Sequence, residues 1–311
     1  MLLLCAASAF AVLPQTLIPG GNTVGLKAYA QGLVVTAVEE NSPAEDAGLR
    51  AGDLLRTANG RSLSSVGELT ELLASADTVE LAYSRGGRQY TATVTPTVTE
   101  NTKRLGICLR DSIAGIGTVT YYDPESSTFG ALGHGINDVD GTTLLPIDGG
   151  VIVPSVVSGI VPSKRGTAGQ LQGEFDVFST VGVIDTNTEN GVFGRSLIPD
   201  RAPLPVGSSE EVTTGSATIL ANVSGSEIGE YEVEILRIYD AGESGRNILL
   251  RVTDRELLEK TGGIVQGMSG SPVIQNGKLV GAVTHVLVNA PELGYGIFVE
   301  NMLQEEAARR S

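Results

Sequence analysis

Short β-branched segments bounded by Gly, Asp, Asn or Pro recur through the second half of the chain and most constrain its fold. They include residues 117–122, 151–153, 181–184, 216–223, 231–238 and 247–252. No long amphipathic helical pattern interrupts them before residues 300–310, and 40 of the 311 residues are glycine. This pattern is typical of strands joined by tight turns. We therefore predict a mainly β domain over residues 112–311, with its strands closed into barrels.

Charge and residue counts exclude several kinds of partner. The net charge is −15, the isoelectric point is near 4.6, and no basic stretch is present. Nucleic-acid binding needs clustered Lys and Arg, so we expect no nucleic-acid partner. Cys5 and Cys108 both lie in apolar runs, and the two histidines are far apart in sequence. We therefore expect no disulfide, no metal site and no cofactor.

The first residues are apolar and are typical of an export signal or a membrane anchor. Residues 1–13 contain no charged side chain, and Pro14 and Gln15 end the run. This apolar run lacks positively charged residues at its beginning, and it is short for a helix that must cross about 30 Å of hydrocarbon. We assign residues 1–16 to a signal or anchor segment with an incomplete beginning; an ordinary apolar strand is the alternative. The protein is then expected to be exported, extracytoplasmic and membrane-anchored.

Residues 17–96 predict a small α/β module. A β-rich run at 31–38 is followed by a capped turn at 42–48, a helical pattern at 66–76 and further strands. The string 41–55, followed by Asn59 and Gly60, resembles a PDZ domain of the bacterial protease-associated type. That resemblance implies a loop that binds a peptide carboxylate, and its apolar-Gly-apolar pattern matches Thr23, Val24, Gly25 and Leu26. Residues 97–111 are expected to be a linker.

Two glycine-framed turns carry the candidate catalytic residues. Ser269 lies in GMSGSP at 267–272, and His134 lies between Gly133 and Gly135. A serine flanked by small residues stays accessible as a nucleophile, and an imidazole can take its proton. The main-chain N–H groups of Gly267 and Ser269 are candidates for the oxyanion hole. A serine peptidase is the leading hypothesis, and the double β-barrel of the chymotrypsin type would place a His turn early and a Ser turn late.

Pattern alone leaves three assignments open. Ser271 is the rival nucleophile, two residues after Ser269. His285, on an apparent strand 16 residues after Ser269, is either a buried packing residue or part of a substrate specificity pocket. The acid that would orient the histidine has several candidates, which are Asp138, Asp140, Asp176, Asp185 and Asp254.

The second domain resembles stage IV sporulation protein B, the SpoIVB-type serine peptidases. The resemblance is carried by ALGHGI at 131–136 with Asp138, by Asn187-Thr188 with GVFG at 191–194, and by residues 253–272, which end in TGGIVQGMSGSP. It continues through QNGKL at 275–279, GAVTHV at 281–286 and GYGI at 294–297. A short N-terminal membrane segment and a PDZ domain also belong to that family, so the resemblance covers nearly the whole chain.

This resemblance implies a triad of His134, Asp254 and Ser269. It also implies self-cleavage and the cleavage of a membrane-associated regulatory protein in sporulation signalling, which activates a mother-cell sigma factor pathway. The expected site of action is the space between the forespore and mother-cell membranes. The PDZ module would bind a peptide C-terminus or the chain's own N-terminal segment. A catalytically silent PDZ scaffold of the cell envelope and an envelope quality-control serine peptidase are the alternatives; the second places its peptidase before its PDZ domain, the reverse of the order here.

Overall fold

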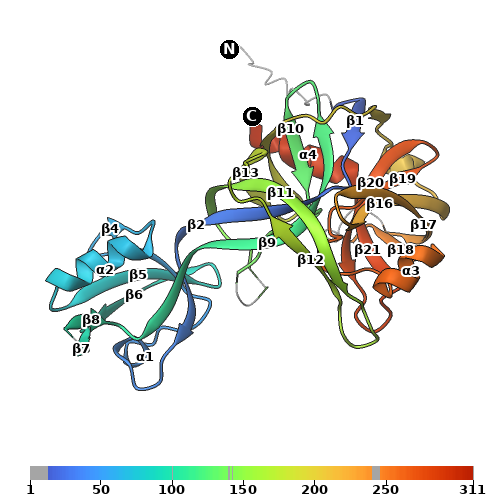
Figure 1. Cartoon of the computed structure of the whole chain (residues 1–311). Helices are drawn as coiled ribbons and strands as arrows, with labels where there is room; N and C mark the ends of the chain where they lie inside the picture. Colours follow the sequence, from blue (N-terminus) through green and yellow to red (C-terminus); the bar gives the residue numbers. More distant parts are fainter. Residues whose placement is uncertain (1–12, 100, 139–140, 142, 240–245, 311) are drawn as a thin grey trace, which may run out of the picture.

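The protein is mainly β, with two barrels and a smaller module set apart from them (Figure 1). The computed structural model describes residues 13–99, 101–138, 141, 143–239 and 246–310. The signal or anchor segment expected over residues 1–16 therefore lies mostly outside the described residues. Within the described ranges, no helix combines the length and the apolar character that a membrane crossing requires.

The first barrel closes through a ring of strand pairings. In ring order the strands are β9 (Ile107–Asp123), β10 (Thr128–Ala131), β14 (Gly191–Ser196), β13 (Gly182–Thr188), β11 (Ile147–Val161) and β2 (Thr23–Val38). The pairing of β2 with β9 completes the ring. Three further strands attach to it: β1 (Thr16–Pro19), β12 (Gln170–Phe175) and β15 (Leu204–Pro205). Ile152, Ile184 and Phe129, all fully buried, lie in its core.

The second barrel is a closed ring formed by the last part of the chain. Its strands in ring order are β16 (Gly215–Ser224), β17 (Glu227–Ile238), β18 (Ile248–Val252), β21 (Leu293–Phe298), β20 (Lys278–Val286) and β19 (Pro272–Gln275). A 3-10 turn (Ser209–Glu211) precedes the ring, and the short helix α3 (Arg255–Thr261) lies between β18 and β19 in sequence. The predicted double β-barrel is thus confirmed.

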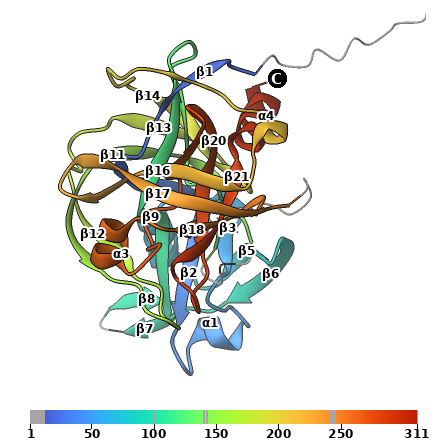
Figure 2. The ribbon, with the colours of Figure 1, turned by 90° about the vertical axis from the view of Figure 1, so that its right-hand side faces the viewer.

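The C-terminal helix joins the two barrels. Helix α4 (Val299–Arg310) packs Met302 and Leu303 into a cluster with Tyr121 of the first barrel and Leu279 of the second. The Tyr121 hydroxyl donates to the buried Glu306 carboxylate at 2.8 Å. Figure 2 shows α4 beside β20 and β21. This helix therefore fixes the barrels together next to β20, a strand that lines the cavity between them.

The PDZ module is an insertion within the first barrel rather than a domain that precedes it. Its elements are α1 (Pro43–Asp46), β3 (Leu54–Ala58), β4 (Arg61–Ser62), α2 (Val66–Ser75), β5 (Val79–Arg85), β6 (Arg88–Val94), β7 (Thr97–Thr99) and β8 (Thr102–Arg104). Its core draws residues from Leu33 to Leu105. The long strands β2 and β9 carry the chain out of the barrel and back again (Figure 1).

This arrangement corrects the expected boundaries. Residues 17–30, assigned from sequence to the PDZ domain, pair as most of β1 and the first half of β2 with barrel strands. Residues 97–111, expected to be a linker, form the β7–β8 hairpin and the beginning of β9. The register of β2 against β9 shifts between Tyr29 and Val34, where Gly32 has φ +133°. A Cβ at Gly32 would lie 2.3 Å from the Leu55 carbonyl oxygen, so glycine permits this bulge.

Candidate active site

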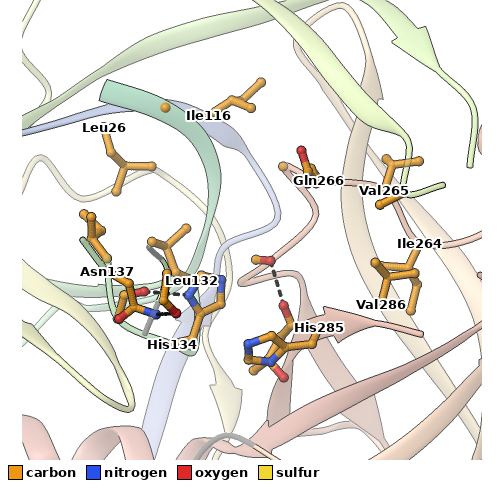
Figure 3. Close-up of a pocket in the computed structure, with 18 of the residues that line it drawn as sticks. Leu26, Ile116, Leu132, His134, Asn137, Ile264, Val265, Gln266, His285 and Val286 are labelled. Carbon is orange, nitrogen blue, oxygen red and sulfur yellow. Dashed lines mark hydrogen bonds between the residues drawn. The ribbon is translucent and has the colours of Figure 1, made fainter. Parts of the chain in front are cut away.

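A cavity of about 580 Å³ holds both sequence-predicted catalytic residues. The first barrel lines it with Leu26, Leu132, His134 and residues 113–116 and 135–137. The second barrel contributes Ser269, His285 and residues 264–267. Figure 3 shows the rings of His134 and His285 next to one another. Their ring centroids are 5.1 Å apart. The site therefore forms only when the two barrels pack together.

The nucleophile loop is held against the first barrel by Thr118. The Thr118 N–H donates to the Ser269 carbonyl at 3.0 Å, and its hydroxyl donates to the Gly267 carbonyl at 2.7 Å. Gly270 makes this approach possible, because a Cβ there would lie 2.0 Å from the Thr118 carbonyl oxygen and its φ is +97°. The glycines of the motif thus allow close backbone contact between the barrels.

Burial distinguishes the two candidate serines. Ser271 is fully buried and its hydroxyl has no hydrogen-bond partner among the described residues. Ser269 lines the cavity and donates its hydroxyl proton to the Thr284 carbonyl at 2.7 Å. In the described part of the chain, the Gly267 and Ser269 amides donate to no protein acceptor. Their N–H groups remain available to an oxyanion.

The histidine turn follows β10 directly. Leu132 and Gly133 both have φ +68°, and a Cβ at Gly133 would lie 2.9 Å from Thr284 Cγ2 of the second barrel. The glycine therefore lets the turn approach β20. Asn187 supports the chain two residues after His134, because its side-chain amide bonds both the N–H and the carbonyl of Ile136, at 2.8 and 2.7 Å. The turn is thus braced from β13 as well.

His134 is oriented by a main-chain carbonyl. Its Nδ1 lies 2.8 Å from the Gly135 carbonyl oxygen. A carbonyl can only accept, so Nδ1 carries the proton and Nε2 keeps its lone pair, as a general base requires. Removal of the ring from water lowers the pKa of His134 below the ordinary 6.5, and the Gly135 carbonyl partly opposes that shift. The imidazole is neutral at pH 7.

Asp254 lies elsewhere, which corrects the expected triad. Its carboxylate caps helix α3 by accepting from the Leu257 N–H at 2.8 Å and from the Glu232 N–H at 3.4 Å. It does not line the cavity that holds His134 and Ser269. The short segment between Asp254 and Ser269 thus contains helix α3, and Asp254 caps the N-terminus of that helix. Sequence motifs do not distinguish such a cap from a catalytic acid.

The other candidate acids also have contacts away from the cavity. Asp138 accepts from the Thr143 N–H, Asp176 from the Ser179 hydroxyl, and Asp185 pairs with Arg195. None of these three lines the cavity. Asp140 lies outside the described residues. Among the described residues, the group that orients His134 is the Gly135 carbonyl, which no side-chain pattern reveals.

His285 is exposed and faces the cavity, so it is not the buried packing residue that we considered. It lies on β20, whose residues 285 and 286 pair with β21. Desolvation, the neighbouring His134 and Arg246 lower the pKa of His285 to about 4. At neutral pH both imidazoles are uncharged. Among the described residues, no group of three or more His, Cys, Asp or Glu side chains is arranged to hold a metal ion.

The residues expected to bind a peptide carboxylate are inside the first barrel. Thr23, Val24, Gly25 and Leu26 are all buried in β2. Val24 and Gly25 pair with β11 on one edge, and residues 23–26 pair with β9 on the other. Both edges of the strand are therefore occupied, and no peptide can add to it. The apolar-Gly-apolar pattern here reflects close barrel packing, since a Cβ at Gly25 would lie 2.5 Å from the Phe175 ring.

Sequence reasoning missed three contributors to this site. Thr118 anchors the nucleophile loop, Asn187 braces the histidine turn, and the Thr284 carbonyl holds the Ser269 hydroxyl. Asn187 belongs to a stretch that the family resemblance had marked. Thr118 lies in an ordinary β-branched strand pattern and carried no signal. Such contacts between distant segments become visible only in three dimensions.

Two protein-family models match the chain. The SpoIVB peptidase S55 model matches residues 101–303, and a PDZ domain model matches residues 34–81. The PDZ match begins at Val34, where β2 has left the first barrel. The peptidase match covers both the candidate nucleophile and the candidate base.

Individual proteins resemble parts of the chain. A Neisseria meningitidis protein named as a candidate zinc metalloprotease is 35% identical over 79 residues, which are 25% of this chain and 18% of that protein. The PDZ domain of an SdrC-like protein from Listeria monocytogenes is 31% identical, covering 26% of this chain and 90% of that one, with a TM-score of 0.25. The inactive form of the Rv3671c protease from M. tuberculosis is 13% identical, covering 62% of this chain and 83% of that one, with a TM-score of 0.38.

Replacement of Asp254 separates a helix cap from a catalytic acid. Asn caps a helix as well as Asp does, so Asp254→Asn should keep kcat/KM within about tenfold of the parent, whereas loss of a triad acid costs about 10⁴-fold. Asp254→Ala should lower the free energy of unfolding by about 1 kcal/mol. Peptide hydrolysis and urea unfolding measure these effects. A several-thousandfold loss of kcat/KM in a folded Asp254→Asn protein would restore the triad.

The pH dependence of activity should report the lowered pKa of His134. The base works when neutral, and its pKa lies below the ordinary 6.5, so kcat/KM should fall only as the pH drops below about 6.5. Because the chain has two histidines, ¹⁵N NMR of His285→Gln would report His134 alone. Its spectrum should show the Nδ1–H tautomer at pH 7. A midpoint above 6.5, or the Nε2–H tautomer, would contradict this description.

Proposed function

The chain belongs to the SpoIVB peptidase S55 family and is a serine peptidase, and from this premise we propose that Ser269 and His134 are its catalytic pair. The observation that carries the proposal is their position in one cavity, with Nδ1 of His134 bonded to a carbonyl and two free N–H groups beside Ser269. Ser271 lacks this access because it is buried.

The proposed reaction follows the chemistry of acyl transfer. The Ser269 hydroxyl leaves the Thr284 carbonyl and gives its proton to Nε2 of His134, while Oγ attacks the peptide carbonyl carbon. The N–H groups of Gly267 and Ser269 stabilise the oxyanion. His134 then protonates the leaving amine, and water, activated by the same imidazole, hydrolyses the acyl-enzyme. The Gly135 carbonyl holds the Nδ1–H throughout, which keeps the ring oriented and favours its charged form.

For the biological substrate we propose the chain itself and a membrane-associated regulatory protein in sporulation signalling. Family membership supports this role. The apolar residues 1–13 support export and anchoring at a membrane, which would bring the peptidase to such a substrate. A protein held at a membrane surface meets a membrane-bound target at high local concentration.

For the PDZ module we propose a peptide site along β9 instead of residues 23–26. Residues 107–110 of β9 pair with β2 on one edge, and no described strand pairs with their other edge. Helix α2 packs beside that part of β9. The partly buried side chains Leu72 of α2 and Ile107 and Leu109 of β9 pack against the module's core. An added peptide strand would therefore lie between β9 and α2 over an apolar floor.

The end of this groove suits a peptide carboxylate. Leu105, Gly106 and Ile107 repeat the apolar-Gly-apolar pattern where β9 begins, and Gly106 has φ +75°. Lys103 lies at the C-terminal end of α2, with its Nζ 2.6 Å from the Ala76 carbonyl and 3.2 Å from the carboxylate of Asp77, an exposed partner that a peptide carboxylate would have to replace. A cation and main-chain N–H groups at one end of an apolar groove favour a C-terminal carboxylate. The chain's own N-terminal segment is the other candidate occupant.

Catalysis by Ser269 predicts a sharp difference between two neighbouring serines. Ser269→Ala should abolish self-cleavage and labelling by a fluorophosphonate probe, with a loss of about 10⁶-fold in turnover. Ser271→Ala is the matched control, since its buried hydroxyl has no described partner and can be replaced at little cost. Intact-mass spectrometry and probe labelling check both variants. A folded parent that neither labels nor cleaves would favour the silent scaffold.

Peptide binding by the PDZ module is tested by fluorescence polarisation on the full chain carrying Ser269→Ala. A peptide ending in a free Val carboxylate should bind more tightly than its amidated form. Leu72→Glu should remove the binding by placing a charge over the groove, whereas Glu71→Ala, an exposed neighbour, should not. An amidated peptide of residues 2–13 tests the chain's own segment. Equal binding by the parent and Leu72→Glu would contradict the groove.

A further inference from the structure

One end of the active-site cavity is apolar and is not used by the proposed chemistry. Ile264, Val265 and Val286 line it, together with Ala168 and Val288. Figure 3 shows Ile264, Val265 and Val286 on the side of His285 that faces away from His134. Ile264 and Val265 are 2% and 1% exposed, while Val286 is half-buried. These residues line the cavity that also holds Ser269, although Ile264 and Val265 have most of their side-chain surface packed in the core of the second barrel.

The walls of this end are held by hydrogen bonds to their main chain. The Ile264 N–H donates to the Pro291 carbonyl at 2.8 Å, and its carbonyl accepts from the Ser163 hydroxyl at 2.8 Å. Gln266 exchanges main-chain bonds with Gly169 and Leu171. These bonds fix the segment that leads into the nucleophile loop. The apolar end is therefore a preformed pocket, which suits selective binding of a side chain.

The backbone of β20 provides a way to deliver that side chain. His285 and Val286 pair with β21 on one edge. On the other edge the β19 pairing reaches only Ala282, and the Val283 N–H still donates to Ser271. Beyond that point the edge at residues 284–286 borders the cavity. An extended substrate can add there as a strand, which places one side chain of the substrate in the apolar pocket next to Ser269.

Among the described residues, no charged side chain lines the pocket; Arg246, which lowers the pKa of His285, lies outside that lining. The two imidazoles are uncharged at neutral pH, because the pKa of His285 is lowered to about 4 and that of His134 is also lowered. A charged side chain would lose its water without gaining a partner, which strongly disfavours it. A branched apolar side chain would gain from leaving water.

We propose that Ile264, Val265 and Val286 form the primary specificity pocket, and that the peptidase cleaves after a medium-sized apolar residue such as Val, Leu, Ile or Met. This inference rests on the proposed catalytic role of Ser269. It adds the chemical class of the residue on the N-terminal side of the cleaved bond. Asn137 and Leu26 lie toward the other end of the cavity and do not determine this preference.

The experiment uses the full chain and internally quenched peptides that differ only in the residue before the cleaved bond. Val, Leu, Ile and Met should exceed Lys, Arg, Asp and Glu by about 100-fold in kcat/KM. Val286→Glu should reduce cleavage after apolar residues and raise cleavage after Lys and Arg. Val183→Glu, the same change at an exposed residue outside the cavity, should leave the preference unchanged.

Fluorophosphonate labelling of the same samples distinguishes a failure of the specificity pocket from a failure of the catalytic role of Ser269. A labelled parent that prefers charged residues would refute the pocket alone, as would a labelled Val286→Glu protein with the parent's preference. A folded parent with neither labelling nor cleavage would refute the catalytic role and the pocket together. Labelling with an apolar preference that Val286→Glu shifts toward basic residues would support both.

Discussion

Two hydrogen bonds from Thr118 dock the nucleophile loop of the second barrel onto a strand of the first. The main-chain N–H holds the Ser269 carbonyl and the hydroxyl holds the Gly267 carbonyl, in a position that is 1% exposed. The contact requires Gly270, whose missing side chain leaves room for the Thr118 carbonyl. His134 lies in a turn of the first barrel, directly after β10. The contact between the barrels therefore brings His134 and Ser269, the two candidate catalytic residues, into one cavity.

The strand that carries Thr118 also carries the proposed peptide edge of the PDZ module. Strand β9 begins beside α2, runs along β2 into the first barrel and ends past the nucleophile loop. The module is thereby built into the barrel through two continuous strands. Strands paired over such a length move together more readily than parts joined by a flexible linker. The architecture gives the PDZ module a defined position relative to the peptidase.

Sequence reasoning succeeded where local chemistry decided the outcome. Glycine and capping residues are needed at fixed positions in the turns around His134 and Ser269 and in the PDZ string at 41–55. Such residues can be recognised directly in the sequence. The mainly β character and the double barrel followed from short β-branched segments. The reasoning failed for Asp254 and for residues 23–26. A capping carboxylate resembles a catalytic one in sequence, and a glycine in a packed strand resembles a glycine in a binding loop.

The sequence by itself determined the class of fold and the presence of a PDZ module, and it marked Ser269 and His134 as the candidate catalytic residues. These depend on residue types and short spacings, which the chain displays directly. Only the tertiary structure decided that the PDZ module is an insertion, that a carbonyl orients His134, and that no charged residue is among the described residues lining the cavity. These features arise from contacts between segments far apart in the chain, such as Gly133 against Thr284, and no local pattern encodes which segments will meet.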